Sequence, residues 1–483
     1  MQSRLIFKVL GFLIIMFSVS LLPPLLIGWY DRDATVQVFL QSWGGLLLLG
    51  VLMWFPNRKK LDELRIRDGF LIVVLFWVVL ALSGALPFIL SGHPQMSVVD
   101  AVFESMSGLT TTGATVLIGL DDLPRSILYY RQQLQWLGGM GIIVLAVAIA
   151  PVLGVGGMQL FRAETPGPMK NNKLTPRITE TAKALWLVYF GLTVVAALLF
   201  YLAGMSLFDA IGHSFSTMAT GGFSTHDASI AYFNSPLIDG IAMLFMLIAG
   251  INFSLHYLAI HHRSLRHYLF DSEVKAYLLI LFVLSLITIS LLIREGTFTD
   301  TLSAVRYGLF QVISFATTTG YTSTGFSYWP GLLPVLLIIG SFVGGCAGST
   351  GGGMKVIRVE LLIRQGRREI DRLLHPNAVL PIKLNKRPVS DTVINAVWGF
   401  FALYVISFVS LGLLMMMTGS DIVTAFSAIA ATLNNLGPGL GEVTENYRSI
   451  SDAGKWILSF TMLLGRLELF SLLVVLTPAF WKR

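Results

Sequence analysis

The sequence has little charge and a single cysteine. Asp, Glu, Lys and Arg make up 13% of the 483 residues and apolar residues make up 54%, whereas soluble domains carry about 25% charged residues. So few charges cannot cover the surface of a water-soluble protein of this length, which excludes a soluble enzyme, and so many apolar residues exclude a disordered chain. Because Cys346 is alone, an intrachain disulfide and a cysteine-based metal cluster are also excluded. The histidines show no metal-binding spacing, so we expect no transition-metal site.

Long apolar runs account for most of the chain. A membrane-spanning helix needs about 20 mostly apolar residues. The sequence predicts ten such spans: 5–29, 36–55, 70–91, 133–153, 184–204, 237–260, 276–293, 331–347 with a broken continuation to about 362, 393–417 and 456–480. The first begins with Arg4 and Lys8 like a signal peptide, but its apolar run is too long and no cleavage site follows, so we interpret it as a membrane helix.

The net charge of +7 is better explained by membrane topology than by nucleic acid binding. With the N-terminus inside, 26 of the 34 Lys and Arg residues fall on inner segments and seven on outer ones, while Arg466 lies within the last span. Because inner loops of membrane proteins are enriched in Lys and Arg, this distribution predicts that both termini are cytoplasmic.

A sequence pattern recurs four times on the outer side, roughly every 100 residues. Each copy is a short, moderately apolar helical segment that ends in a cluster of Thr, Asn and Gly. The copies are 100–113, 209–222, 307–320 and 424–437. A helix of about 12 residues is about 18 Å long and cannot cross a ~30 Å hydrocarbon core, so it must enter and turn back. Irregular backbone at membrane depth needs a protein or aqueous lining, so four such turns predict a central aqueous pathway with pseudo-fourfold symmetry.

The turns contain no carboxylate, histidine or thiol, which leaves carbonyl and hydroxyl oxygens as the available ligands. Rings of carbonyls that replace an ion's hydration shell form potassium filters. The short helices direct their partially negative C-terminal ends to the same axis, which favours a cation.

The four turns and several longer phrases resemble a known family. Each repeat is similar to the M1–P–M2 unit of potassium channels, and the chain as a whole resembles the Trk/Ktr/HKT superfamily of potassium transporters, in particular the TrkH-type translocating membrane subunit. The phrases that carry this resemblance include GLTTTGAT (108–115), FVGGCAGSTGGGMKVIR (342–358), ATLNNLGPGLG (431–441) and GRLELF (465–470). The resemblance implies an all-α polytopic membrane protein of four fused repeats with two extra N-terminal transmembrane helices.

The family resemblance also assigns the filter residues. It implies one filter glycine per repeat, namely Gly113, Gly222, Gly320 and Gly437. The potassium-binding carbonyls would belong to Thr111, Thr112, Thr220, Gly221, Thr318, Thr319, Asn435 and Leu436. The fourth turn departs from the others, since Asn434 and Asn435 replace Thr and Pro438 follows the glycine.

The repeats divide the chain into five parts. We expect two helices outside the repeat in 1–67, repeat 1 in 68–180, repeat 2 in 181–272, repeat 3 in 273–388 and repeat 4 in 389–483.

The third repeat contains a glycine-rich break below its filter turn. No stable helix can run through it, because each interior glycine costs about 1 kcal/mol. Its expected gate residues are Gly344, Gly345, Gly348, Ser349, Thr350, Gly351, Gly352 and Gly353, with Arg466 from the last span. A packing kink and a structural arginine are the alternatives. In the resembled family the loop is an intramembrane gate, and Arg466 would add a cationic barrier.

Two functional hypotheses remain open at this point. The first is potassium uptake across the bacterial inner membrane through a channel-like filter, and the second is a secondary active potassium symporter driven by protons or sodium. A membrane-embedded enzyme is disfavoured because the sequence shows no catalytic constellation. We expect potassium as the transported ion, no organic cofactor, contact with membrane lipid and no nucleic acid partner. The family implies a homodimer and a cytosolic nucleotide-binding regulatory subunit of TrkA type, for which the basic segments 162–183 and 355–387 are candidate docking sites.

Overall fold

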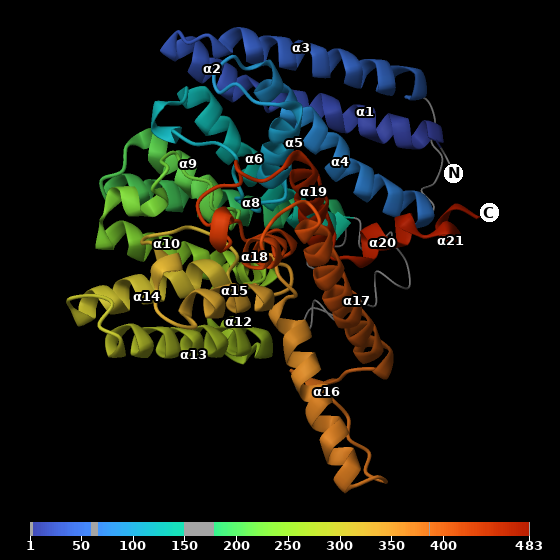
Figure 1. Cartoon of the computed structure of the whole chain (residues 1–483). Helices are drawn as coiled ribbons and strands as arrows, with labels where there is room; N and C mark the ends of the chain where they lie inside the picture. Colours follow the sequence, from blue (N-terminus) through green and yellow to red (C-terminus); the bar gives the residue numbers. More distant parts are fainter. Residues whose placement is uncertain (1–2, 59–65, 149–177, 386, 483) are drawn as a thin grey trace.

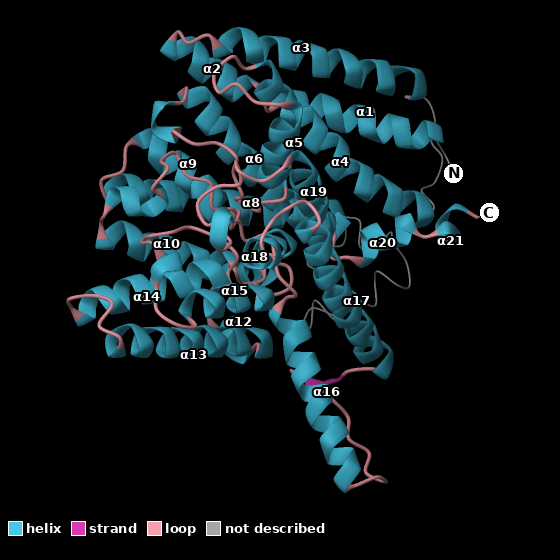
Figure 2. Ribbon diagram, viewed as in Figure 1, coloured by secondary structure: helices cyan, strands magenta, loops and turns pink. Residues whose placement is uncertain are grey.

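The computed structural model describes residues 3–58, 66–148, 178–385 and 387–482. Most of these residues are helical, as predicted, and loops and turns join the helices (Figure 2). The described strands are one antiparallel pair of two-residue strands, β1 (Lys383–Leu384) and β2 (Arg387–Pro388).

Two apolar spans precede the repeats, as predicted. The first consists of α1 (Ser3–Val19) and α2 (Leu22–Asp31), which together form one candidate span, and the second contains α3 (Thr35–Trp54). α1 and α3 lie side by side along one face (Figure 1). Glycines allow this approach, since a Cβ on Gly11 would come within 2.8 Å of the carbonyl oxygen of Gly50.

Four helical units follow, and each has a long helix, a short helix and a second, often broken, helix. Repeat 1 is α4 (Ile66–Leu90), α5 (Val98–Leu109) and α6 (Arg125–Ala148). Repeat 2 is α8 (Ile178–Leu202), α9 (Leu207–Met218), α10 (Pro236–Ala249) and α11 (Phe253–His261). Repeat 3 is α13 (Ser272–Arg294), α14 (Thr301–Ala316), α15 (Leu333–Val343) and α16 (Val356–Leu374). Repeat 4 is α17 (Asp391–Met416), α18 (Ile422–Leu433), α19 (Asp452–Arg466) and α20 (Phe470–Leu476). α12 (Arg266–Phe270) links repeats 2 and 3, and α21 (Pro478–Trp481) follows repeat 4.

Two predicted spans are not continuous, which corrects the sequence analysis. Within the described residues, six helices are long and apolar enough to cross a membrane, and two bent pairs raise the number to eight. The predicted span 237–260 bends by 95° between α10 and α11, and 456–480 bends by 118° between α19 and α20. Asn252 caps α11 by accepting from the Ser254 N–H, while Glu468 and Leu469 have positive φ values of 53° and 54°. These local conformations end each helix in the middle of an apolar run.

The second helix of repeat 1 begins earlier than predicted. α6 begins at Arg125, whereas the span was predicted from 133, because Arg131 and Gln132 are buried inside the protein rather than exposed in a loop. The end of this span beyond 148 and most of the basic segment 162–183 lie outside the described residues.

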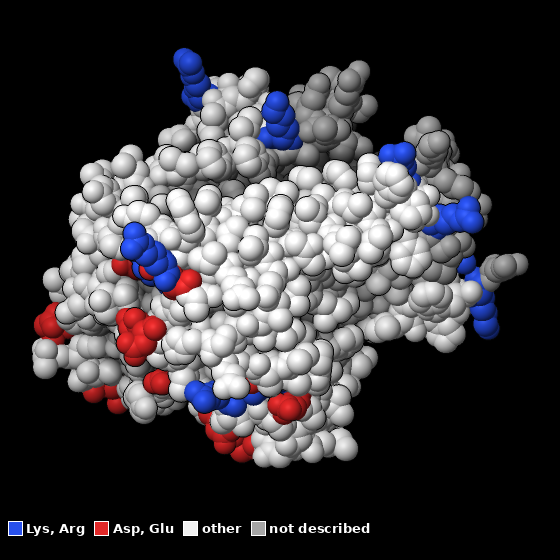
Figure 3. Space-filling view, turned by 90° about the horizontal axis from the view of Figure 1, so that it is seen from above, with Lys and Arg blue, Asp and Glu red and all other residues white. Residues whose placement is uncertain are grey.

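The outer surface is suited to a bilayer. Figure 3 shows a broad face without charged side chains, with acidic and basic residues together on its left and lower edges and Lys and Arg residues at its right edge. Many large apolar side chains are exposed on the outside of the helices, for example Leu52, Leu202 and Phe282, which are 63%, 69% and 64% exposed. The start of α1 and the end of α21 lie at the same end of the molecule (Figure 1). α16 projects away from the bundle at the bottom of this view.

Candidate functional site

The four short helices begin in the same way. In each, the residue before the helix caps it: Ser97, Ser206 and Asp300 accept from the backbone N–H three residues on, and Asp421 accepts from those two and three residues on. Asp100 and Asp209 lie three residues further along, inside the first turn of their helices. Ser97 donates to the Asp100 carboxylate at 3.0 Å and Ser206 to that of Asp209 at 2.7 Å, a reciprocal cap with a short acidic residue.

The four helices also end in the same way. In each repeat a backbone N–H reaches back to the carbonyl five residues earlier, which closes a Schellman-type turn. These bonds are Thr112 to Ser107 at 2.9 Å, Gly221 to Ser216 at 2.8 Å, Thr319 to Ser314 at 2.8 Å and Leu436 to Ala431 at 2.7 Å. The fourth turn therefore has the same backbone conformation as the others, despite its Asn residues.

Two residues of each turn have left-handed backbone conformations. The first is Thr111, Thr220, Thr318 or Asn435, with φ between 51° and 60°. The second lies two residues on and is Gly113, Gly222, Gly320 or Gly437, with φ of 83°, 81°, 78° and 100°. Alternation of left- and right-handed conformations turns successive carbonyls to the same side of a strand, and glycine adopts φ > 0 without steric cost.

The four turns form a closed ring. A Cβ on Gly113, Gly222 or Gly320 would lie well within 3.0 Å of the carbonyl oxygen of the neighbouring repeat, namely Gly221, Thr319 and Leu436 respectively. A Cβ on Gly437 would lie 2.7 Å from the carbonyl oxygen of Thr112, which closes the ring. Each predicted filter glycine therefore faces a predicted ion-site carbonyl of the next repeat.

The Asn side chains of the fourth turn tie it to its neighbours. Asn435 donates to the Thr112 hydroxyl at 2.9 Å and to the Met462 carbonyl at 3.0 Å. Asn434 accepts from the Tyr404 hydroxyl and donates to that of Ser341 at 2.9 Å. These bonds hold the fourth turn in the ring with polar contacts that Thr is too short to make.

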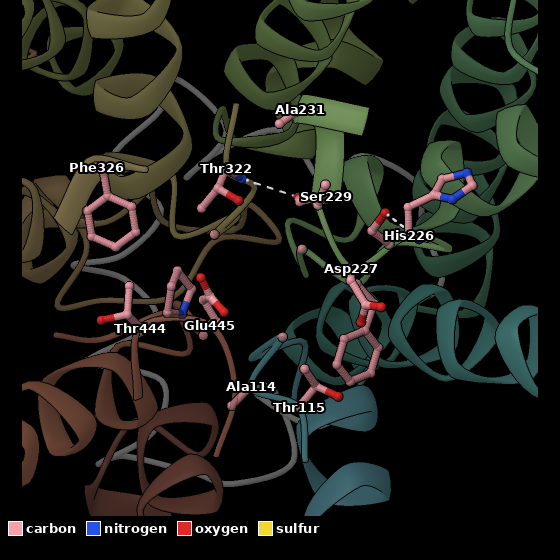
Figure 4. A pocket seen from close by; sticks show the side chains of 18 of the residues that line it. Ala114, Thr115, His226, Asp227, Ser229, Ala231, Thr322, Phe326, Thr444 and Glu445 are labelled. Atoms are coloured by element: carbon pink, nitrogen blue, oxygen red, sulfur yellow. Dashed lines mark hydrogen bonds between the residues drawn. The ribbon is translucent and has the colours of Figure 1, made fainter. Parts of the chain in front are cut away.

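A cavity of about 290 Å³ lies against the ring, on the side predicted to face outward. Its floor includes the four filter glycines, and its wall includes Asp227 and Glu445, which Figure 4 shows on opposite sides of it. Carboxylates here raise the local cation concentration. Burial lowers the pKa of His226 on the same wall, but the hydrogen bonds and negative charges of Asp209 and Asp121 outweigh burial and raise this pKa above its ordinary value.

The glycine-rich loop also lies against the ring, and none of residues 344–353 lines the cavity. It contacts repeat 2 through the Thr350 hydroxyl, which is 3.3 Å from that of Thr220. It contacts repeat 3 through the Gly352 N–H, which donates to the Thr318 hydroxyl at 2.6 Å. It contacts repeat 4 through the Gly353 N–H, which donates to the Asn434 carbonyl at 3.1 Å. The loop therefore packs against the turns of repeats 2, 3 and 4.

The remaining loop residues show how it is folded. Gly344, Gly348 and Gly353 have φ of 72°, 71° and 71°, while Ser349 and Thr350 are fully buried. The Glu273 carboxylate links the loop to the start of α16, since one oxygen accepts from the Ala347 N–H at 2.7 Å and from the Ile357 N–H at 3.2 Å.

Arg466 is the last residue of α19 and contacts this loop. Its guanidinium donates to the Thr350 carbonyl at 3.1 Å and to the Gly138 carbonyl at 3.2 Å, and its side chain is 4% exposed. The structure thus brings the two predicted gate elements together. Carbonyl contacts are compatible with both a gating and a structural arginine, so its role stays a prediction.

Arg466 is not the only buried cation among the described residues. Arg131 is 1% exposed and donates to Glu104 at 2.8 Å, and Arg358 is 1% exposed and donates to Glu468 at 2.6 Å. Lys355, also buried, donates to the Gly351 carbonyl. The predicted spans left Arg131 just outside 133–153 and placed Lys355 and Arg358 in the broken continuation of 331–347 to about 362, and only the tertiary structure shows their acceptors.

Comparisons with known proteins agree with this architecture. A family model described as a cation transport protein, TrkH, matches residues 35–483. The chain is 54% identical over 100% of both chains to the Trk system potassium uptake protein TrkH of Vibrio parahaemolyticus and to that of Escherichia coli. It is 37% identical to the Trk system potassium uptake protein TrkG of Escherichia coli over 99% of each.

A solved structure is similar over its whole length. The crystal structure of the potassium transporter TrkH from Vibrio parahaemolyticus superposes with a TM-score of 0.93 at 52% identity and covers 100% of both chains. Because the family model spans most of the sequence and these relatives match end to end, the chain belongs to the TrkH family of cation transport proteins.

Proposed function

We propose that this protein carries potassium into bacterial cells across the inner membrane through a carbonyl-lined, channel-like filter. The observation that carries the proposal is the closed ring of four equivalent turns, in which each filter glycine faces a carbonyl oxygen of the next repeat. The names of the relatives, which are potassium uptake proteins, support potassium as the substrate.

The potassium-binding groups in this proposal are two stacked rings of carbonyls. One ring is Thr111, Thr220, Thr318 and Asn435, and the other is Thr112, Gly221, Thr319 and Leu436. The C-terminal ends of four short helices converge on these rings, and their partial negative charge stabilises a dehydrated cation.

Residues 344–353 and Arg466 form the gate. The loop closes the inner side of the ring, and the arginine places a positive charge against it. Conduction requires the loop to move aside, and its glycines allow new backbone conformations at little steric cost.

The partners and orientation are also proposals. Both termini would face the cytoplasm, and the chain would form a homodimer that binds a cytosolic nucleotide-binding subunit of TrkA type. The projecting α16 and the following loop support a docking role, since Leu373, Leu374 and Val379 are 83%, 71% and 92% exposed.

Reconstitution tests the proposal. Purified protein in liposomes should conduct potassium and rubidium in preference to sodium, and current should persist across the voltage range when no proton or sodium gradient is present. A flux that requires a proton or sodium gradient would instead identify a symporter. Flux without discrimination among these ions would contradict the assignment of the filter.

A further inference from the structure

One carbonyl of the filter is held by a side chain from behind the ring. Gln135, which is fully buried in α6 of repeat 1, donates from Nε2 to the carbonyl oxygen of Gly221 at 2.6 Å. Its Oε1 accepts from the Phe223 N–H at 3.1 Å. Because a backbone N–H can only donate, the second bond fixes the amide orientation and directs the NH₂ group to Gly221. The amide therefore bridges the backbone on both sides of the filter glycine Gly222.

The same amide explains why the second repeat has glycine at position 221. A Cβ there would come within 3.0 Å of three atoms of the Gln135 amide. In repeats 1 and 3 the position is Thr112 or Thr319, whose hydroxyl lies 2.8 Å from that of Thr110 or Thr317. In repeat 4 it is the buried, apolar Leu436. Among the described residues, we find a side-chain donor to a carbonyl of this ring only at Gly221.

We infer that Gln135 is a specificity-determining residue of the filter. It makes the four carbonyls of this ring unequal, because, within the described part of the chain, that of Gly221 accepts a side-chain hydrogen bond and the other three do not. The inference rests on the proposed filter function. The positive end of the donor N–H offsets part of the negative potential that the Gly221 oxygen presents to an ion, and the hydrogen bond also leaves this carbonyl less free to move toward the axis. Both effects disfavour sodium, because the smaller ion needs a stronger and closer set of oxygens to replace its hydration shell.

The test compares two buried glutamines of the same helix. Gln133 donates to the Ser20 carbonyl at 2.8 Å, outside the filter, and serves as the matched control. Gln135→Met, which keeps the length of the side chain and removes both polar bonds, should lower the potassium-to-sodium permeability ratio roughly three- to tenfold. Gln133→Met should leave the ratio at its wild-type value. The measurement is the reversal potential of the full-length protein in liposomes.

Gln135→Glu supplies a second readout that a merely structural role would not give. A protonated carboxyl can donate to the Gly221 carbonyl as the amide does, whereas a carboxylate repels it. The permeability ratio of this variant should therefore fall at alkaline pH and recover at acid pH, relative to wild type measured in parallel. Arg131 lies one turn earlier on α6 and is paired with Glu104, so both are charged groups that wild type and variant share.

Three outcomes separate the hypotheses. A reduced ratio in Gln135→Met with a pH-dependent ratio in Gln135→Glu supports the inference. Wild-type ratios in both variants at every pH overturn it and leave the filter assignment intact. A wild-type protein that does not discriminate potassium from sodium overturns the proposed function, and the inference with it.

Discussion

Substitution of a filter glycine should impair ion selection more than folding. We choose Gly320→Ser because rigid atoms surround this glycine. A Cβ would overlap the backbone carbonyl of Leu436 and lie 2.8 Å from Cδ of Pro438. Neither atom belongs to the flexible end of a side chain, so the two strands of the ring must separate.

The size of the effect follows from the backbone. Gly320 has φ of 78°, and a residue with a Cβ in this region is strained by about 1–2 kcal/mol. If relief of that strain moves the Thr319 and Leu436 carbonyls off the axis, the potassium-to-sodium permeability ratio should fall by roughly 5- to 30-fold. Potassium and sodium fluxes in liposomes, normalised to incorporated protein, measure this ratio.

Two glycines provide controls that separate strain from collision. Gly331 has φ of 62°, but no atom lies within 4 Å of the position that a Cβ would occupy, so Gly331→Ser should lower stability without altering selectivity. Gly240 has neither positive φ nor a close neighbour, so Gly240→Ser should change neither property. A well-expressed Gly320→Ser protein with wild-type discrimination, or an equal loss in Gly331→Ser, would refute the reasoning.

Three further predictions concern the gate and the outer cavity. Arg466→Ala and deletion of part of 347–352 should each raise basal potassium flux without a regulatory partner. Their combined effect should be less than additive because both act on one barrier. Unchanged flux in both variants would show that the arginine and the loop have only a structural role. Glu273→Ala leaves the Ala347 and Ile357 N–H groups unpaired, so the free energy of unfolding should fall by on the order of 2 kcal/mol in denaturation experiments. The same variant should show a higher potassium leak in liposomes. Glu273→Gln keeps an acceptor oxygen and should lose less stability. Because the pKa of His226 is raised, its protonated form contributes its full stabilisation below about pH 6.5, and this contribution disappears as pH rises through the raised pKa. In His226→Asn the melting temperature should therefore depend less on pH between about pH 6 and about pH 8. An unchanged pH profile would contradict the pairing of His226 with Asp209 and Asp121.

Local sequence patterns were sufficient to predict the fourfold repeat. Short apolar helices cannot span a bilayer, and a Thr-Gly or Asn-Gly cluster after each one predicts a turn with positive φ. The structure has such turns at all four places, with glycine at φ of 78° to 100°. The helical class and the pseudo-fourfold arrangement could be predicted because each copy contains its own helix, cap and turn, and because the copies recur in register.

Only the tertiary structure decided what lies around the turns. Nothing in the apolar run 237–260 predicts a bend of 95°, and nothing near Gln135 predicts that it bonds to residues 221 and 223. The same holds for Arg131, which is buried against Glu104 rather than exposed in a loop. For Gln135 and Arg131 the decisive partner is a backbone carbonyl, N–H or carboxylate distant in sequence. A buried polar side chain is stable only with such partners. The periodicity of the sequence does not indicate which remote groups the fold brings within hydrogen-bonding distance.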